Sequence, residues 1–158
     1  MTLAITSPAF AADGDIPARY TCDGEDCSPP LAFAGLPAGT ASLALIIEDP
    51  DAPDPAAPRM TWVHWIVYDI PPTTRALAEN AARRGLPPGA RTGRNDWQRS
   101  GYGGPCPPVG RHRYVHRLLA LDTVLPDLKG PTKAELERAL AGHVLEEARL
   151  VGRYARSG

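Results

Sequence analysis

The 158-residue sequence lacks any long hydrophobic run, and its uninterrupted apolar stretches, such as Leu43–Ile47 and Leu118–Leu121, are short. A membrane-spanning helix needs about 20 apolar residues, so we do not expect the chain to span a membrane. The sequence also lacks an excess of either charge, with 17 basic and 18 acidic residues. A balanced chain carries no electrostatic footprint for nucleic acid, and we expect no nucleic-acid partner.

Cysteine is scarce, because Cys22, Cys27 and Cys106 are an odd number and too few for a disulfide framework. Cys22 and Cys27 can meet across the loop between them, but reduced thiols in a turn are our expectation. None of the three has zinc-ligand partners nearby in the sequence. No basic residue precedes Arg19, so residues 1–12 fit an edge strand and turn better than a secretory leader. We therefore expect a cytoplasmic protein.

Glycine and proline are abundant instead, with 15 and 18 residues, which indicates a compact, loop-rich domain. No repeat or low-complexity tract divides the chain, so we expect one domain over residues 1–158. Three runs rich in apolar, β-branched or aromatic residues predict strands: Ser42–Glu48, Thr61–Ile70 and His112–Asp122. We expect the first of them to end at the proline-rich segment that begins with Asp49 and Pro50.

Helix is expected mainly near the C-terminus. Thr132 and Glu135 form a capping-box pattern, followed by apolar residues at helical spacing. We also predict a further helical segment over Val144–Leu150 and a short one within Arg75–Arg84. The fold class is therefore mainly β, with one or two C-terminal helices and a short mid-chain helix.

Strand alternation brings chemically active side chains to the ends of the predicted strands. It assigns these residues to shared faces: Leu43, Leu45, Ile47 and Asp49; Trp62, His64, Ile66 and Tyr68; His112, Tyr114, His116 and Leu118. If the three faces point into one space, Asp49, His64, His112 and Tyr114 converge there, and Asp51 faces the same mouth. We expect Trp65 and Tyr68 to lie in the core.

This set of side chains suits an anionic oxygen ligand. Imidazolium N–H and tyrosyl O–H groups donate to such a ligand, while the aspartate orients one imidazole and holds its proton. The glycine-rich loop 101–110 adds backbone N–H groups. The plainer alternative is that Asp49 and Asp51 only cap turns and the histidines are ordinary strand residues.

A second function class is a hydrolase or metal enzyme that uses Asp49, His64 and His112, since two histidines and a carboxylate form a minimal metal set. The sequence has no His-x-x-x-His pair, no Gly-x-Ser-x-Gly elbow and no phosphate-binding P-loop. A tyrosine beside the histidines suits anion binding better than metal ligation. We therefore expect a non-enzymatic binding protein with no metal and no cofactor.

Several ordered blocks resemble the phosphatidylethanolamine-binding protein family. They are Asp49-Pro-Asp-Ala-Pro53, Trp62-Val-His-Trp65 and Gly103-Gly-Pro-Cys-Pro-Pro-Val-Gly-Arg-His-Arg-Tyr114. Further segments resemble its bacterial branch, the YbhB/YbcL or Raf-kinase-inhibitor-like proteins: Ile16-Pro17, Tyr20-Thr-Cys-Asp-Gly24, Ser28-Pro-Pro-Leu31, Asn95-Asp96 and Gly142-His-Val-Leu145.

The resemblance implies two antiparallel sheets in a Greek-key, sandwich-like arrangement, with a small pocket for phosphate-like anions or phosphorylated ligands of the phospholipid head-group or nucleotide class. Matched by motif, the pocket would be lined by Asp49, His64, His112 and Tyr114. Backbone at Gly104 and Pro105 would form one wall, with Pro53 and Trp62 near the rim. The resemblance also suggests a homodimer and a kinase or protease partner that the domain modulates, although such roles depend on surfaces outside these motifs.

Overall fold

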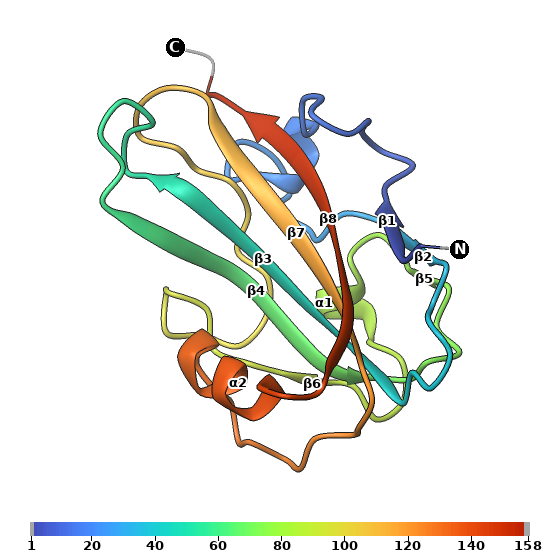
Figure 1. The fold of residues 1–158 in the computed structure, drawn as a ribbon. Helices are drawn as coiled ribbons and strands as arrows, with labels where there is room; N and C mark the ends of the chain where they lie inside the picture. The colour runs from blue at the N-terminus through green and yellow to red at the C-terminus, as the bar shows by residue number, and fades with distance from the viewer. Residues whose placement is uncertain (1, 157–158) are drawn as a thin grey trace.

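In the computed structural model, which describes residues 2–156, the three apolar runs become central neighbours in one sheet. The sheet is antiparallel and ordered β6-β4-β3-β7-β8. Its strands are β3 (Ser42–Ala52), β4 (Met60–Ile70), β6 (Arg91–Thr92), β7 (His112–Leu121) and β8 (Val144–Tyr154). Figure 1 shows the four long strands running side by side across the molecule.

A second, smaller antiparallel sheet covers part of the large one, in the order β1-β2-β5. The remaining elements are β1 (Ala4–Thr6), β2 (Leu31–Ala34), β5 (Ala76–Leu77), the 3-10 turn η1 (Ala18–Tyr20), α1 (Ala81–Arg84) and α2 (Lys133–Leu140). The predicted class, mainly β with two antiparallel sheets, a C-terminal helix and a short mid-chain helix, is confirmed. The edge strand expected near the N-terminus is β1.

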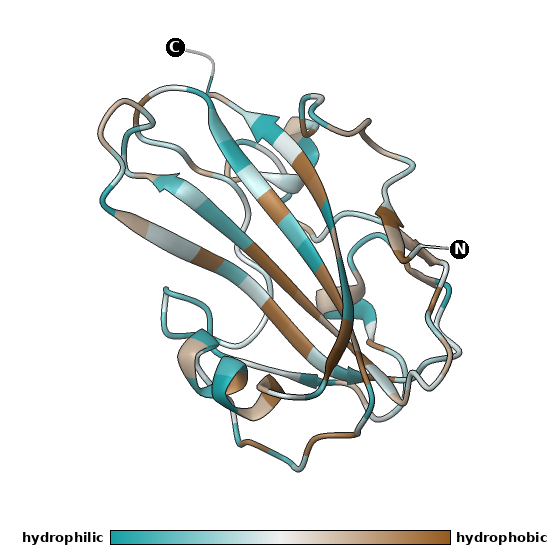
Figure 2. Cartoon of the chain, in the orientation of Figure 1, coloured by the Kyte–Doolittle hydropathy of each residue, from teal (hydrophilic) through white to brown (hydrophobic). Residues whose placement is uncertain are grey.

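Both faces of the large sheet are buried along its central strand β3, which explains why this strand is a continuous apolar run. Leu43, Leu45 and Ile47 pack on the side of the small sheet, whereas Ala44 and Ile46 pack against α2 on the other side. Figure 2 shows the resulting hydrophobic bands across the central strands. The capping box predicted for α2 is present: the Glu135 backbone N–H donates to the Thr132 hydroxyl, and the Thr132 backbone N–H to the Glu135 carboxylate.

The helix predicted over Val144–Leu150 is wrong, because this segment is the first part of β8. Gly142 takes a φ of 83° and turns the chain back after α2. The strand then pairs with β7 along its full length, from Leu121↔Val144 to His112↔Tyr154. The free edge of β7 thus overrides the helix propensity of the Glu, Ala and Arg residues in this segment.

β3 also continues four residues beyond the predicted end, from Asp49 through Pro50 to Ala52. Its pairing with β7 stops at Glu48, and beyond that point β3 pairs only with β4. A proline is tolerated here because the strand has become an edge strand. Asp49 and Asp51 therefore lie in the part of β3 that extends beyond its pairing with β7.

Candidate functional site

β4 contains a β-bulge at His64. Ile47 of β3 pairs with Trp65, but the next residue, Glu48, pairs with Val63, so His64 is an extra residue without a register partner. In a bulge, two successive side chains can point to the same side of the sheet. His64 lines a cavity on the same side as the core residue Trp65, whereas Val63 belongs to the opposite face.

The predicted shared face of β4 is therefore only half right. Trp62 and His64 line one cavity together, but Ile66 and Tyr68 pack on the other side of the sheet, beneath α2. Strict alternation fails because the bulge shifts the pattern by one residue. The expected core positions of Trp65 and Tyr68 are confirmed, since both are fully buried.

The cavity has a volume of about 400 Å³ and lies where β3 ends and where β4 and β7 begin. Most of its wall is apolar, and its polar side-chain groups come from six residues: Asp49, Trp62, His64, Trp97, His112 and Tyr114. Its lining consists of Asp49, Ala52, Pro53, Met60, Trp62, His64, Trp97, Cys106, Pro107, Pro108, His112 and Tyr114. Of the predicted site residues, Asp49, Pro53, Trp62, His64, His112 and Tyr114 are brought together, whereas Asp51, Gly104 and Pro105 are not part of the lining.

Asp49 and His112 form a buried pair at the cavity floor. The Nδ1 of His112 lies 2.6 Å from an Asp49 carboxylate oxygen, and the Asp51 backbone N–H donates to the other oxygen at 2.7 Å. The His112 Nε2 lies 2.8 Å from the carbonyl oxygen of Val109. Burial raises the pKa of Asp49, opposed by the hydrogen bond to His112. As expected, the aspartate orients one imidazole, but both His112 nitrogens are bonded to protein oxygens.

His64 differs from the charged imidazole that the sequence suggested. Its side chain is 3% exposed, and burial lowers its pKa to about 4. Its Nδ1 lies 2.7 Å from the Gly103 carbonyl oxygen, so this nitrogen carries the proton. Asp49 does not raise the pKa of His64, because its carboxylate is paired with His112 and desolvation dominates at His64. His64 is neutral at pH 7.

Two buried hydrogen-bond donors in the lining have no partner among the described residues: the Tyr114 hydroxyl and the Trp62 indole Nε1. Burial also raises the pKa of Tyr114 well above its ordinary value, so its O–H keeps its proton. A buried donor left unpaired costs about 1–3 kcal/mol, and native proteins contain few of them. Two of them in the lining of one cavity indicate that a bound molecule or water completes them.

The three predicted residues outside the lining have positioning contacts instead. Asp51, near the end of β3, does not face the cavity and instead accepts hydrogen bonds from the Arg113 guanidinium at 2.8 and 3.0 Å. The Gly104 N–H donates to Asp26 at 2.8 Å, and a Cβ at Gly104 would collide with the Tyr20 carbonyl oxygen. The Pro105 carbonyl accepts from the Cys22 N–H at 3.1 Å.

The cysteines also differ from the expectation of reduced thiols. Cys22 and Cys106 form a disulfide with 5.4 Å between their Cα atoms, and Cys27 is a buried free thiol. The two partners are 84 positions apart in the sequence, so local spacing gave no sign of them. Because Cys106 lines the cavity, the disulfide fastens the cavity wall to the loop that follows η1.

Trp97 is the main lining residue that the sequence reasoning missed. Its ring meets the His64 ring edge-on, with 5.1 Å between centroids, and the Trp62 ring at 5.4 Å. The preceding Asn95-Asp96 pair holds it there. Asn95 accepts from the Trp97 N–H at 2.9 Å, and Asp96 accepts from the Val63 N–H at 2.7 Å. The Asn95-Asp96 motif was therefore the available signal.

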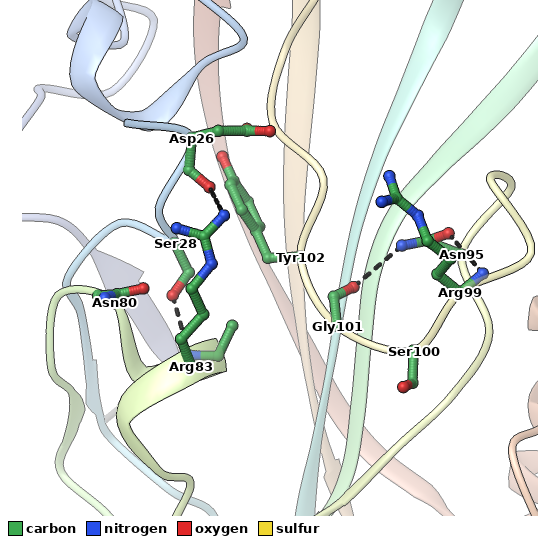
Figure 3. A pocket seen from close by; sticks show the side chains of 10 residues that line it. Asp26, Ser28, Asn80, Arg83, Asn95, Arg99, Ser100, Gly101 and Tyr102 are labelled. Atoms are coloured by element: carbon green, nitrogen blue, oxygen red, sulfur yellow. Dashed lines mark hydrogen bonds between the residues drawn. The ribbon is translucent and has the colours of Figure 1, made fainter. Parts of the chain in front are cut away.

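A second cavity, of about 220 Å³, lies beside α1 and is more polar (Figure 3). Arg83 donates to the carbonyl oxygens of Glu25 and Asp26 at 3.3 Å, and the Asn95 amide donates to the Gly101 carbonyl at 3.1 Å. Apart from the side-chain oxygen of Asn80, no buried side-chain polar atom of its described lining lacks a partner. Its polar groups are largely paired within the protein, so the first cavity is the better candidate.

Within residues 2–156, no group of three or more His, Cys, Asp or Glu side chains is arranged to hold a metal ion. In the same range, no helix is long and apolar enough to cross a membrane.

The chain belongs to the phosphatidylethanolamine-binding protein family, whose sequence model matches residues 6–155. A UPF0098 protein of Methanothermobacter thermautotrophicus is 51% identical over 149 residues, covering 94% of this chain and 95% of the relative. The solved structure of the homologue CT736 from Chlamydia trachomatis superposes with a TM-score of 0.91 at 41% identity, covering 99% of each chain. Escherichia coli YbcL superposes at 0.89 and 31% identity, covering 99% of this chain and 100% of YbcL. The relatives of this chain thus include archaeal and bacterial proteins.

Proposed function

We propose that the cavity of about 400 Å³ binds the oxyanion end of a small phosphorylated or phosphate-like ligand, of the phospholipid head-group or nucleotide class, without chemical conversion. The unpaired Tyr114 O–H and Trp62 N–H carry this proposal, since both are donors that an anionic oxygen can accept from. The apolar wall around them fits the organic part of such a ligand, as small-molecule sites generally do.

The composition of the cavity argues against the hydrolase alternative. Apart from Tyr114, no described lining residue has a hydroxyl, and Cys106 is in the disulfide. The raised pKa of Tyr114 makes it a weak nucleophile. A metal is equally unsupported by the donors: Asp49 and His112 are hydrogen-bonded to each other, and the His64 Nε2 belongs to no group of three or more ligand side chains among the described residues.

The experiment that tests the function is calorimetric titration with inorganic phosphate, phosphoethanolamine and a nucleoside monophosphate. Tyr114→Phe removes only the hydroxyl and should weaken binding about tenfold or more, the value of one lost hydrogen bond to a charged group. Tyr68→Phe is the matched control, because its buried hydroxyl accepts from the Leu128 N–H on the opposite face of the sheet. If both variants bind all three ligands like the parent protein, the cavity is not the binding site.

The location and partners of the protein stay predictions. The disulfide argues against the expected cytoplasmic location, because the cytoplasm generally keeps exposed cysteines reduced. Some hyperthermophiles are an exception to this rule. A homodimer and a kinase or protease partner are proposed only from the family resemblance. Light scattering of the purified protein would test the first, and inhibition assays the second.

A further inference from the structure

His64 is held in one tautomer by a reciprocal pair of hydrogen bonds. Its Nδ1 N–H donates to the Gly103 carbonyl at 2.7 Å, and the Gly103 N–H donates to the His64 carbonyl at 3.1 Å. The Trp97 and Tyr114 rings meet the imidazole edge-on at 5.1 and 5.2 Å, which restricts its rotation. A carbonyl oxygen can only accept, so the proton of the neutral ring must stay on Nδ1.

The consequence is that the His64 Nε2 is a hydrogen-bond acceptor, not a donor. Burial lowers the pKa of His64 to about 4 and outweighs the opposing hydrogen bonds to the Gly103 and Gly104 backbone, with smaller lowering contributions from His116 and His112 on β7. The ring is therefore neutral over most of the usable pH range. Asp49 of β3 does not offset this effect, because its carboxylate is bonded to His112. Among the described residues, the side-chain hydrogen bond of His64 with good geometry is the one from Nδ1 to Gly103, and His64 lines the cavity, so Nε2 is the ring nitrogen left for a ligand.

The cavity therefore offers a mixed set of polar groups. Tyr114 O–H and Trp62 N–H are donors, whereas the His64 Nε2 is an acceptor. A phosphate monoester monoanion matches all three, because it has acceptor oxygens and one P–OH group. A sulfate or sulfate ester has only acceptor oxygens and leaves the His64 nitrogen facing a lone pair.

We propose that this cavity selects oxyanions that carry a hydroxyl proton, such as a phosphate monoester monoanion, over fully deprotonated oxyanions such as sulfate, and that His64 makes the selection. The inference rests on the proposed function and specifies its ligand class. It also gives the neutral histidine a role that a charged anion-binding imidazole would not have.

The test compares methyl phosphate with methyl sulfate by calorimetric titration at pH 5.5. The second pKa of a phosphate ester is about 6, so both ligands are mainly monoanions of similar shape there, and only the phosphate has a donor. We expect methyl phosphate to bind about tenfold tighter or more, since an unsatisfied buried acceptor is costly. Equal affinities would overturn the inference but keep the proposed function, whereas no binding of either ligand would overturn both.

Two variants separate the role of His64 from a general loss of affinity. In His64→Gln, the amide can rotate to present either a donor or an acceptor, so the preference should fall to roughly twofold or less. Trp62→Phe removes a donor that both ligands use, so it should weaken both and leave their ratio unchanged. A preference that survives in His64→Gln would contradict the assignment.

The tautomer can be measured without any ligand. Nitrogen-15 NMR of labelled histidine should show a protonated Nδ1 and an unprotonated Nε2 for His64 at pH 5.5 and above. A protonated Nε2 would overturn the inference whatever the titrations show.

Discussion

Removing the disulfide between Cys22 and Cys106 should lower stability strongly without unfolding the protein. A cross-link between residues 84 positions apart restricts the unfolded chain. The loop-entropy relation gives about 4.5 kcal/mol at 25 °C for a loop of that length. For a domain of this size, each kcal/mol corresponds to about 2–4 °C in Tm, so the expected decrease is about 9–18 °C.

The native fold should survive because other contacts join the same two loops. The Tyr102 hydroxyl donates to the Tyr20 carbonyl at 2.7 Å, and the Gly104 N–H donates to Asp26 at 2.8 Å. The far-UV spectrum of the reduced protein should therefore match that of the oxidised protein at 25 °C. The stability difference then arises mainly in the unfolded state.

The assay is thermal unfolding of the oxidised protein, the reduced protein and a Cys22→Ser, Cys106→Ser double variant, with mass spectrometry to verify each redox state. The double variant is also the control, because a reductant should not change its Tm; the remaining Cys27 is a buried free thiol. A decrease of less than about 3 °C between the oxidised and reduced proteins would refute the reasoning, since loop entropy would then be a minor contribution.

Three further predictions follow from buried polar groups and a helix cap. Arg117→Met should lower the free energy of unfolding by about 2–3 kcal/mol in urea titrations, because it leaves the nearly buried Glu48 with Lys133 as its one remaining cationic partner. Thr132→Ala should cost about 1 kcal/mol in the same assay by removing the cap of α2. Burial lowers the pKa of His116 to about 4. The free energy of unfolding should therefore fall as pH decreases from about 6.5 toward 4, by about 1.4 kcal/mol per pH unit for this group. A His116→Asn variant whose stability has the same pH dependence as the parent protein would contradict this.

The large sheet was predictable because its three central strands are coded locally. Their apolar runs must be buried on both faces, and their proline- and glycine-rich borders mark most of the ends. β8 was not predictable, because its Glu, Ala and Arg residues favour helix in isolation. It becomes a strand only by pairing with the edge of β7. That edge belongs to the tertiary structure and leaves no local pattern in the residues of β8.

The convergence of four side chains on one cavity was predictable from the sequence, but their protonation states were not. Alternation and motif matching both selected Asp49, His64, His112 and Tyr114, and all four line one cavity. Alternation succeeded at His64 even though the bulge lies beside it, because Trp62 and His64 precede the shift. The charge of an imidazole depends on its burial and partners, and neither is readable from residue spacing.

The irregular loop between Gly103 and Val109 connects these observations. Its first carbonyl fixes the tautomer of His64, its last carbonyl accepts from His112, and Cys106 between them is tied to Cys22. The sheet supplies the side chains, but this loop determines which of their atoms remain free for a ligand. Backbone carbonyls orient both imidazoles, and only His112 also has a carboxylate partner. This division explains why one histidine of the site is fully bonded within the protein while the other keeps one nitrogen available as an acceptor.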